Sequence, residues 1–264
     1  TLEPPPPVDS VTQFIAAASD PTDDAVRALA AVLRADATVI TPFGRATGPA
    51  AVGELLGVPR LRGTLGAATW GPPRRDGATT TVEAVLPPGA PAAAIRSTIT
   101  VDADEMITGV VQEVVAAPPP EPTALVLPAE VRDDVNGALV NGTPVVVAYV
   151  DAGGAPHLSL RGSTQANGDD RLALWIRDPG GGLLRAIAER PILALFYRDG
   201  GRGRTYQFTG RARVAEDAAT RDAVYAGQPE AERNLDPYQR GVAVIVDLDS
   251  VEGIGAAGRF RLER

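Results

Sequence analysis

The stretch that decides the fold of the C-terminal half runs from residue 156 to residue 191. Residues 156–165 read PHLSLRGSTQ and residues 172–177 read LALWIR, after which the chain continues DPGGG, LLRAIA, Glu-Arg and Pro191. The first two pieces have the composition of strands, and the apolar residues of LLRAIA recur at helical spacing. Proline ends the helix because it cannot continue the hydrogen-bond ladder. The order predicted is strand, strand, glycine-rich loop, helix.

Further strand-like runs lie on both sides of this stretch. A helix is predicted first, over residues 131–139, with Gly142 as its stop. Asp151 to Gly154 predicts a hairpin turn, and another helix is expected near residues 217–225. The predicted strands are residues 145–150, 156–161, 172–176, 192–197, 205–214 and 242–248. Six short strands with regular turns favour a closed barrel over an open sheet.

This order of elements resembles the FMN-binding split β-barrel of the pyridoxamine-phosphate-oxidase-like and flavin-reductase-like proteins, over most of residues 123–264. The resemblance implies a homodimer whose flavin sites lie at the subunit interface. It also carries cofactor-binding roles onto three groups of residues in this chain. These are Arg161, Gly162, Ser163, Thr164 and Gln165; Trp175, Ile176 and Arg177; and Gly181, Gly182, Leu183 and Leu184 at the helix start.

The chain departs from the oxidases of that family at the phosphate loop. Where those enzymes carry Ser-Arg-Lys, this chain has Asp-Pro-Gly-Gly-Gly at residues 178–182, and the lysine that ends their first motif is absent as well. Pyridoxamine oxidation is therefore not expected, whereas the fold assignment is unaffected.

The loop before Leu183 nevertheless has the physical properties of an anion site. A helix N-terminus presents unpaired N–H groups and partial positive charge, and glycine lets the backbone approach a phosphate closely. Arg161 and Arg177 could add charge-assisted hydrogen bonds. The competing interpretation is that Asp178 caps the helix and Pro179 occupies its first position, with no ligand involved.

Several other candidates have both a functional and a structural interpretation. Ser163 to Gln165 could read the polar edge of a flavin ring or form a solvated strand end. Trp175 is expected in the core, and His157 is interpreted as a strand residue rather than a proton donor. Arg211 and Arg213 share one strand face, which is expected to be solvated. Residues 236–240 could close the site from a partner subunit.

The composition excludes several kinds of chemistry. The chain has no cysteine and no lysine, and His157 is its one histidine. Thiolate catalysis, Schiff-base lysines and multi-histidine metal sites are therefore excluded, and no metal is expected. If the protein is an enzyme, the difficult chemistry belongs to an organic cofactor.

Charge and hydropathy limit the partners. The formal net charge is -8 without any block of basic residues, so nucleic acid is not an expected partner. No stretch approaches the run of about 20 apolar residues needed to span a bilayer. We therefore expect a cytoplasmic protein that acts on a small molecule and does not bind membranes.

The N-terminal half is predicted to be a separate domain. Proline density marks residues 117–122 as a linker and residues 3–7 as a disordered lead-in. Between them, helical spacing at residues 11–18 and 26–33 and near 50–56 is followed by strands at 79–86, 95–101 and 106–115, with an earlier strand at 38–41. Helices first and an antiparallel sheet afterwards predict α+β architecture.

Residues 36–52, DATVITPFGRATGPAAV, resemble the SnoaL-like, nuclear-transport-factor-2-like α+β cone (a cystatin-like roll), which we place at residues 8–116. That superfamily contains isomerases, cyclases and non-catalytic modules. Isomerase chemistry would need a buried acid, and Asp36, Glu83 and Glu113 form no acid–base pair. A non-catalytic or ligand-binding role is therefore expected for this half.

The leading hypothesis is an FMN-dependent oxidoreductase built on the barrel, with the substrate unidentified. A deazaflavin (coenzyme F420) is the alternative cofactor. Two further alternatives are a flavin- or ligand-binding protein without turnover and an enzyme whose activity lies in the N-terminal half alone.

Overall fold

The computed structural model describes residues 9–264, and the proline-rich stretch 3–7 lies outside this range. The chain divides into two compact units, Thr1–Pro118 and Pro119–Arg264. The division falls inside the proline-rich segment, where few ladder or helix hydrogen bonds can form. Within residues 9–264, no helix is both long enough and apolar enough to cross a membrane.

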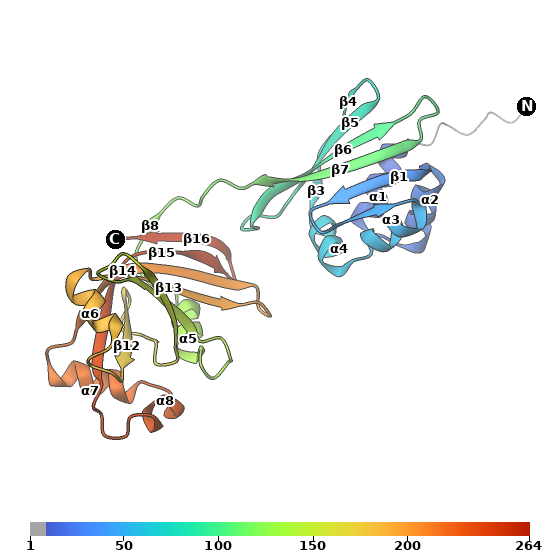
Figure 1. Cartoon of the computed structure of the whole chain (residues 1–264). Helices are drawn as coiled ribbons and strands as arrows, with labels where there is room; N and C mark the ends of the chain where they lie inside the picture. Colours follow the sequence, from blue (N-terminus) through green and yellow to red (C-terminus); the bar gives the residue numbers. More distant parts are fainter. Residues whose placement is uncertain (1–8) are drawn as a thin grey trace, which may run out of the picture. The chain divides into compact units, whose positions relative to one another are not determined.

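In its described part, residues 9–118, the first unit combines four helices with a seven-stranded sheet (Figure 1). The helices are α1 (Ser10–Ser19), α2 (Asp23–Ala31), α3 (Pro49–Leu56) and α4 (Pro59–Gly66). The strands are β1 (Leu33–Thr41), β2 (Gly44–Thr47), β3 (Thr69–Trp70), β4 (Arg74–Asp76), β5 (Thr79–Val85), β6 (Ala92–Val101) and β7 (Ile107–Ala116). The sheet order is β2-β1-β7-β6-β5-β3, with β4 also paired to β5.

Local signals set the boundaries of these helices. The side chains of Asp9 and Thr22 accept hydrogen bonds from the first turns of α1 and α2, and Pro49 occupies the start of α3. One expected boundary is wrong: Leu33, placed at the end of a helix by its spacing, is the first residue of β1. Its side chain is buried in either case, so apolar periodicity alone could not separate the two states.

The interior of the first unit is filled by its own side chains. Phe14, Leu56, Leu61 and Leu65 from the helices pack on the inward-facing residues of the sheet, such as Ile99. Burial alternates along β5 and, from Ile95 onward, along β6, as expected for strands with one face on a core. This unit is therefore a layer of helices on one face of a sheet.

The second unit contains four helices and nine strands. The helices are α5 (Ala129–Gly137), α6 (Gly182–Glu189), α7 (Ala218–Ala226) and α8 (Glu230–Asn234). The strands are β8 (Thr123–Ala124), β9 (Val145–Val150), β10 (Pro156–Arg161), β11 (Gln165–Ala166), β12 (Arg171–Ile176), β13 (Ile192–Asp199), β14 (Arg204–Val214), β15 (Val242–Gly255) and β16 (Gly258–Glu263). The strand order is β10-β9-β13-β14-β15-β12-β11, and β16 joins β15 to β8.

The prediction of six strands in this half is wrong in number. Each predicted strand exists, but β15 extends to Gly255 instead of stopping near residue 248. The pairing of β14 with β15 shifts register between Thr209 and Gly210, which is typical of a bulge. The chain then returns as β16, and the short strands β8 and β11 complete the sheet. A bulge interrupts the alternation of inward- and outward-facing side chains. The strand predicted from that alternation therefore stopped before the true end of β15.

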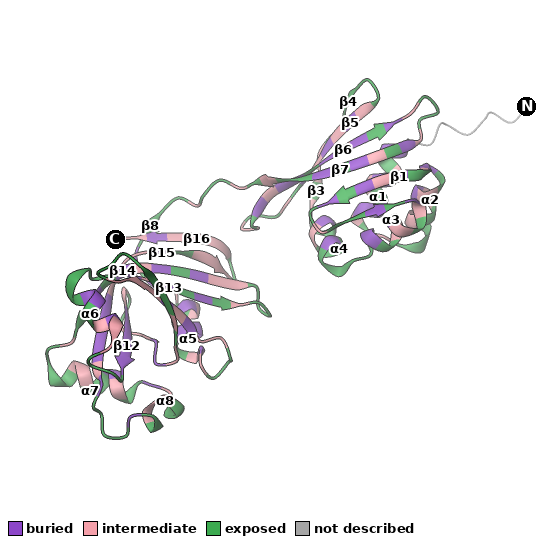
Figure 2. Cartoon of the chain, in the orientation of Figure 1, coloured by how far each residue is buried: buried purple, intermediate pink, exposed green. Residues whose placement is uncertain are grey.

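Strand β12 lies at the centre of this packing. All residues from Leu172 to Ile176 are buried, and Figure 2 shows most of the strand in purple. Leu172, Leu174 and Ile176 face the main core, while Ala173 and Trp175 face a second cluster with Val224 of α7. A strand buried on both faces reads as a continuous apolar run, which is what LALWI is.

Helix α5 is held by a buried carboxylate. Asp134 accepts hydrogen bonds at 2.8 Å from the Tyr206 hydroxyl and from Arg204, and it forms a 2.8 Å ion pair with Arg202. Burial, followed by this hydrogen bond to Asp134, raises the pKa of Tyr206. Asp134 and its three partners therefore join α5 to the hairpin of β13 and β14.

Replacing this carboxylate should destabilise the second unit. Asp134→Ala is expected to lower its free energy of unfolding by about 2–4 kcal/mol, because two guanidinium groups and a buried hydroxyl lose their common acceptor. Urea denaturation followed by circular dichroism measures the change. Asp133→Ala, at the exposed neighbouring position of α5, is the control and should cost less than about 0.5 kcal/mol.

Candidate functional site

The edge strand β10 presents a polar row on one face and an apolar row on the other. Among the strands that the structure describes, it pairs only with β9, from Pro156 opposite Val150 to Arg161 opposite Val145. Because side chains alternate along a strand, His157, Ser159 and Arg161 share one face. Their β9 partners include the fully buried Val145 and Val147, so this row borders the core.

Two atoms of this row are buried without a hydrogen-bond partner among the described residues. They are the Arg161 Nε and the Ser159 Oγ. Arg161 also forms no ion pair within residues 9–264, in contrast to Arg202, Arg204, Arg211 and Arg213. Buried polar groups are normally paired, and a buried charge without a counter-charge is costly. The arrangement is typical of a site that receives an anionic or strongly accepting group from elsewhere.

Helix α6 begins without a side-chain cap. Its N-cap residue is Gly181, and the helix runs from Gly182. The Asp178 carboxylate instead accepts a hydrogen bond from the Gly180 N–H at 3.0 Å, within its own turn. The interpretation in which Asp178 caps the helix is therefore wrong. The Asp178 carboxylate therefore accepts no hydrogen bond from the first-turn N–H groups of α6, which include those of Gly182 and Leu183.

A cavity of about 280 Å³ lies between the start of α6 and the hairpin of β9 and β10. His157 and Tyr149 stack in it, with ring centroids 5.0 Å apart and planes at 11°. The His157 Nε2 lies 2.8 Å from the Asp151 carboxylate. The lining residues are Tyr149, Asp151, Ala152, Gly153, His157, Gly182, Arg185, Ala186 and Glu189.

Most residues of this cavity were not singled out from the sequence. Tyr149 and Arg185 were missed altogether, and His157 was interpreted as a strand residue. The signal that could have found them is the hairpin itself, because the turn at residues 151–154 places Tyr149 directly opposite His157. Arg185 lies on α6 one turn after Gly181, where its side chain donates a hydrogen bond to the Gly180 carbonyl.

The structure does not bring Arg161 and Arg177 to this cavity. Neither residue lines it. Arg161 lies four residues beyond His157, which corresponds to about 13 Å along a strand. Arg177 follows β12, is exposed, and has no hydrogen bond or ion pair among the described residues. The α6 cavity and Arg161 are therefore two ends of an extended surface along β10.

The side chains of Ser163, Thr164 and Gln165 are hydrogen-bonded inside the unit. Ser163 Oγ bridges the backbone of Trp175, donating to its carbonyl and accepting from its N–H. Thr164 donates to the Arg161 carbonyl, and Gln165 donates to the Val224 carbonyl. Ser163 and Thr164 are almost completely buried. Their first role is to join the end of β10 to β12.

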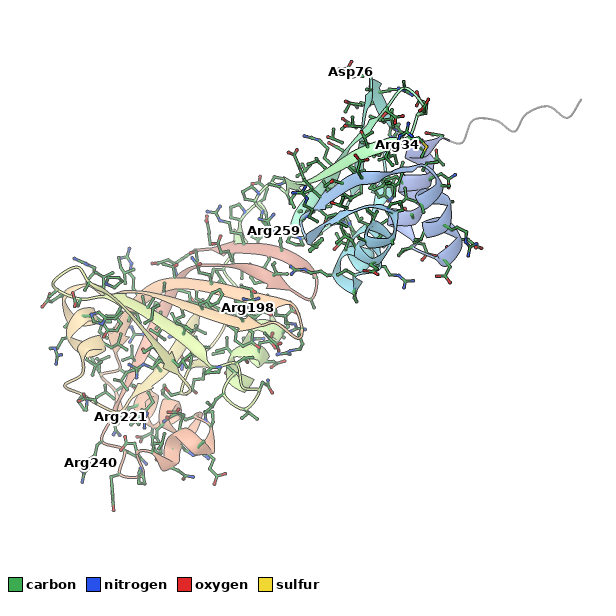
Figure 3. The ribbon with its side chains drawn as sticks, turned by 45° about the vertical axis from the view of Figure 1, so that its right-hand side comes forward. Arg34, Asp76, Arg198, Arg221, Arg240 and Arg259 are labelled. Carbon is green, nitrogen blue, oxygen red and sulfur yellow. The ribbon has the colours of Figure 1, made fainter. Side chains whose placement is uncertain are left out.

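Trp175 lies in the second core cluster, as the structural interpretation predicted. Its indole N–H donates to Asp236 at 3.0 Å, and the Asp236 carboxylate also accepts from the backbone of Arg240 and Gly241. Burial alone would raise the pKa of Asp236, but these three donors together lower it. Arg221 lies 5.1 Å from the Trp175 ring centre, at the same end of the unit as Arg240 (Figure 3).

The remaining predicted site residues fall into two groups. Ile176 and Leu183 are core residues, and Leu184 packs against the same core. Gly162 follows β10 in a crowded turn, where an added Cβ would lie 2.4 Å from the Glu232 carboxylate. The side chains of Ile176, Leu183 and Leu184 thus pack in or against the core, and Gly162 has no side chain, so these four residues could contact a ligand mainly through their backbone.

Other arginines and acids are accounted for without a ligand. Arg211 and Arg213 form surface ion pairs with Asp249 and Asp247, in agreement with a solvated face. In the first unit, Glu83 pairs with Arg96 at 2.8 Å, and both side chains are exposed. Glu113 and Asp36 are exposed as well. No group of three or more acidic or histidine side chains within residues 9–264 is placed to hold a metal ion.

Comparison with known proteins finds likeness in structure alone. No family model and no curated protein matches the chain. A putative pyridoxamine 5'-phosphate oxidase from Lactobacillus delbrueckii is 22% identical, with a TM-score of 0.38, over 49% of this chain and 95% of its own. A pyridoxamine 5'-phosphate oxidase-related, FMN-binding protein from Nostoc punctiforme is 15% identical, with a TM-score of 0.39, over 48% and 81%.

A second kind of solved structure matches a shorter part of the chain. A putative SnoaL-like isomerase from Agrobacterium tumefaciens is 14% identical, with a TM-score of 0.34, over 40% of this chain and 93% of its own. At these scores the likenesses transfer no activity. Both families that the sequence resembles are nevertheless found among the structural neighbours.

Proposed function

We propose that the second unit is a split β-barrel that binds FMN and works as a flavin-dependent oxidoreductase on a small molecule. The observation that carries the proposal is Arg161, a half-buried arginine on the inner face of an edge strand, whose buried Nε has no hydrogen-bond partner within residues 9–264. A flavin has a polar pyrimidine edge and a phosphorylated tail, so it can supply acceptors at both ends of the surface along β10.

The residues of this surface divide between the two ends of such a ligand. The amides at the start of α6 would hold the phosphate, since a helix N-terminus favours an anion. Arg161 and Ser159 would meet the ring edge, and the backbone of residues 162–165 would lie beside it. When bound, the flavin supplies the electron or hydride transfer. The protein contributes orientation, hydrogen bonds to the ring edge and exclusion of water.

Arg161 should therefore matter for binding and not for folding. Arg161→Gln is expected to weaken FMN binding by about 10-fold or more, because a charge-assisted hydrogen bond contributes about 1.5–3 kcal/mol. Quenching of FMN fluorescence on titration with protein measures the change. Arg213→Gln, which removes an arginine from a surface ion pair, is the control and should leave the affinity unchanged.

The same titration separates the alternatives. If the native protein binds neither FMN nor a deazaflavin at micromolar concentration, the cofactor proposal is wrong. Binding of the deazaflavin alone would favour coenzyme F420 as the cofactor. Binding of FMN without reduction by NAD(P)H or a reduced deazaflavin would favour a binding protein without turnover.

We also propose that the barrel forms a homodimer. The outer face of β10 exposes Leu158 and Leu160, which are 74% and 65% exposed. Leu160 lies opposite Val146, and Val146 lies opposite Phe196 of β13, so an apolar row crosses three strands. Ile192 is exposed on the same strand as Phe196. A contiguous apolar patch of this kind usually marks an interface, and a second copy would cover the unpaired edge as well.

A charge on this patch should dissociate the dimer. The double variant Leu158→Glu and Leu160→Glu is expected to sediment as a monomer, because two carboxylates would have to be buried without partners. Analytical ultracentrifugation at micromolar concentration measures the mass. Val140→Glu, at an apolar position that is 80% exposed outside the patch, should leave the dimer intact. A native protein that is already monomeric would contradict the proposal.

For the first unit we propose the SnoaL-like cone over residues 8–116, joined by the linker 117–122 to the flavin domain at 123–264. Its main core cluster is apolar, its buried polar side chains include the hydrogen-bonded pair Ser97 and Gln112, and its candidate acids lie outside that core. These features favour binding or assembly over catalysis. We also propose that the protein is cytoplasmic.

A further inference from the structure

Three of the four asparagines in the chain are followed directly by glycine. They are Asn136, Asn141 and Asn167, and all three lie in the second unit. An asparagine before glycine can cyclise, because glycine has no side chain to hinder attack of its backbone nitrogen on the neighbouring side-chain amide. The three pairs share one local sequence and differ in their structural setting. They therefore form an internal comparison of what the fold protects.

The Asn136–Gly137 pair is held by helix α5. Gly137 is the last residue of α5, so its N–H group belongs to the hydrogen-bond ladder of the helix. The Asn136 side chain is engaged as well, since its Oδ1 atom accepts a hydrogen bond at 2.8 Å from the Ala166 N–H. Both groups that would react are therefore occupied at this pair.

The Asn141–Gly142 pair lies in the turn that follows α5. The Gly142 N–H donates to the Leu139 carbonyl at 3.1 Å, and the Asn141 N–H donates to the Gly137 carbonyl at 2.9 Å. Asn141 is exposed, so its side-chain amide is accessible. The attacking nitrogen of Gly142, however, must first leave its hydrogen bond to Leu139.

The Asn167–Gly168 pair lies in the turn between β11 and β12, where both reacting groups are free. Within residues 9–264, neither the Gly168 N–H nor the Asn167 side chain has a hydrogen-bond partner. Gly168 is exposed and has a φ of 85°. The Asn167 N–H closes the turn by donating to the Arg171 carbonyl at 2.9 Å. The fold thus leaves one of three locally equivalent pairs unprotected.

We propose that Asn167 is a site of spontaneous deamidation. The Gly168 nitrogen, after losing its proton to water or hydroxide, attacks the Asn167 Cγ atom, and the Cγ–Nδ2 bond breaks with release of ammonia. Water then opens the cyclic imide at either of its two carbonyl carbons. One product is aspartate, and the other is isoaspartate, in which the main chain runs through the former side-chain carboxyl carbon. Neither an oxidant nor a catalyst is required.

Both products change the turn that joins β11 to β12. Aspartate adds a negative charge next to Asp169 and Asp170, and isoaspartate also adds a methylene to the main chain inside the turn. Strand β11 has only two residues, which pair with Leu172 and Ala173 of β12. So short a strand has little else to fix its register when the turn lengthens. We therefore expect the modified protein to unfold at a lower temperature than the fresh protein.

Peptide mapping by mass spectrometry, after incubation at neutral and mildly alkaline pH, tests the assignment, because conversion replaces an amide NH₂ by OH and changes the peptide mass. In the folded protein, Asn167 should convert about 2- to 10-fold faster than Asn141, where a hydrogen bond of ordinary net strength must break first. Asn136 should convert more slowly than either. In protein unfolded by urea the three rates should be similar, because the fold no longer separates the pairs.

Two variants complete the test. Asn167→Gln should abolish conversion at this turn and the loss of thermal stability on incubation, because a glutamine side chain would have to close a larger ring. Asn141→Gln is the matched control and should change neither result. The proposal is wrong if Asn136 or Asn141 converts as fast as Asn167 in the folded protein, or if Asn167 converts only after unfolding. Conversion without loss of thermal stability would contradict the expected effect on β11.

Discussion

The pairing of β10 with β9 is the constraint on which the candidate site depends. One register places His157 opposite Tyr149 and Arg161 opposite Val145. A slip of one residue would exchange the two faces of the strand. Leu158 and Leu160 would then face the core, and the row of His157, Ser159 and Arg161 would face outward. The two valines of β9 that are buried in the core hold this register, because their burial fixes which face of the hairpin is inside.

The buried polar groups of the second unit belong to two classes. Asp134 and Asp236 each accept several hydrogen bonds from within the chain, so they fix α5 and the loop before β15. Ser163 and Gln165 are satisfied in the same way. Arg161 and Ser159 differ, since each retains a buried atom without a partner among the described residues, as do Arg171 and Gln228. Arg161 and Ser159 share one face of β10, whereas the other two lie on other elements.

The second unit also separates its surfaces by strand face. The inner side of β10 is polar and borders the core, whereas its outer side is apolar and exposed. Ligand and second subunit would therefore approach the same edge strand from opposite faces. Alternation of side chains along a strand is sufficient to produce this arrangement.

The sequence by itself determined the order of elements in both halves, because apolar periodicity and the Pro and Gly breaks are local properties. It also determined the absence of lysine, cysteine and multi-histidine chemistry, and it located α6 and the core position of Trp175. The tertiary structure decided the extension of β15 past its bulge, the start of α6 at an uncapped glycine, and the meeting of Tyr149, His157 and Arg185 around one cavity. It also separated Arg161 from that cavity. These features depend on register and on contacts between residues far apart in the chain, and no local pattern encodes them.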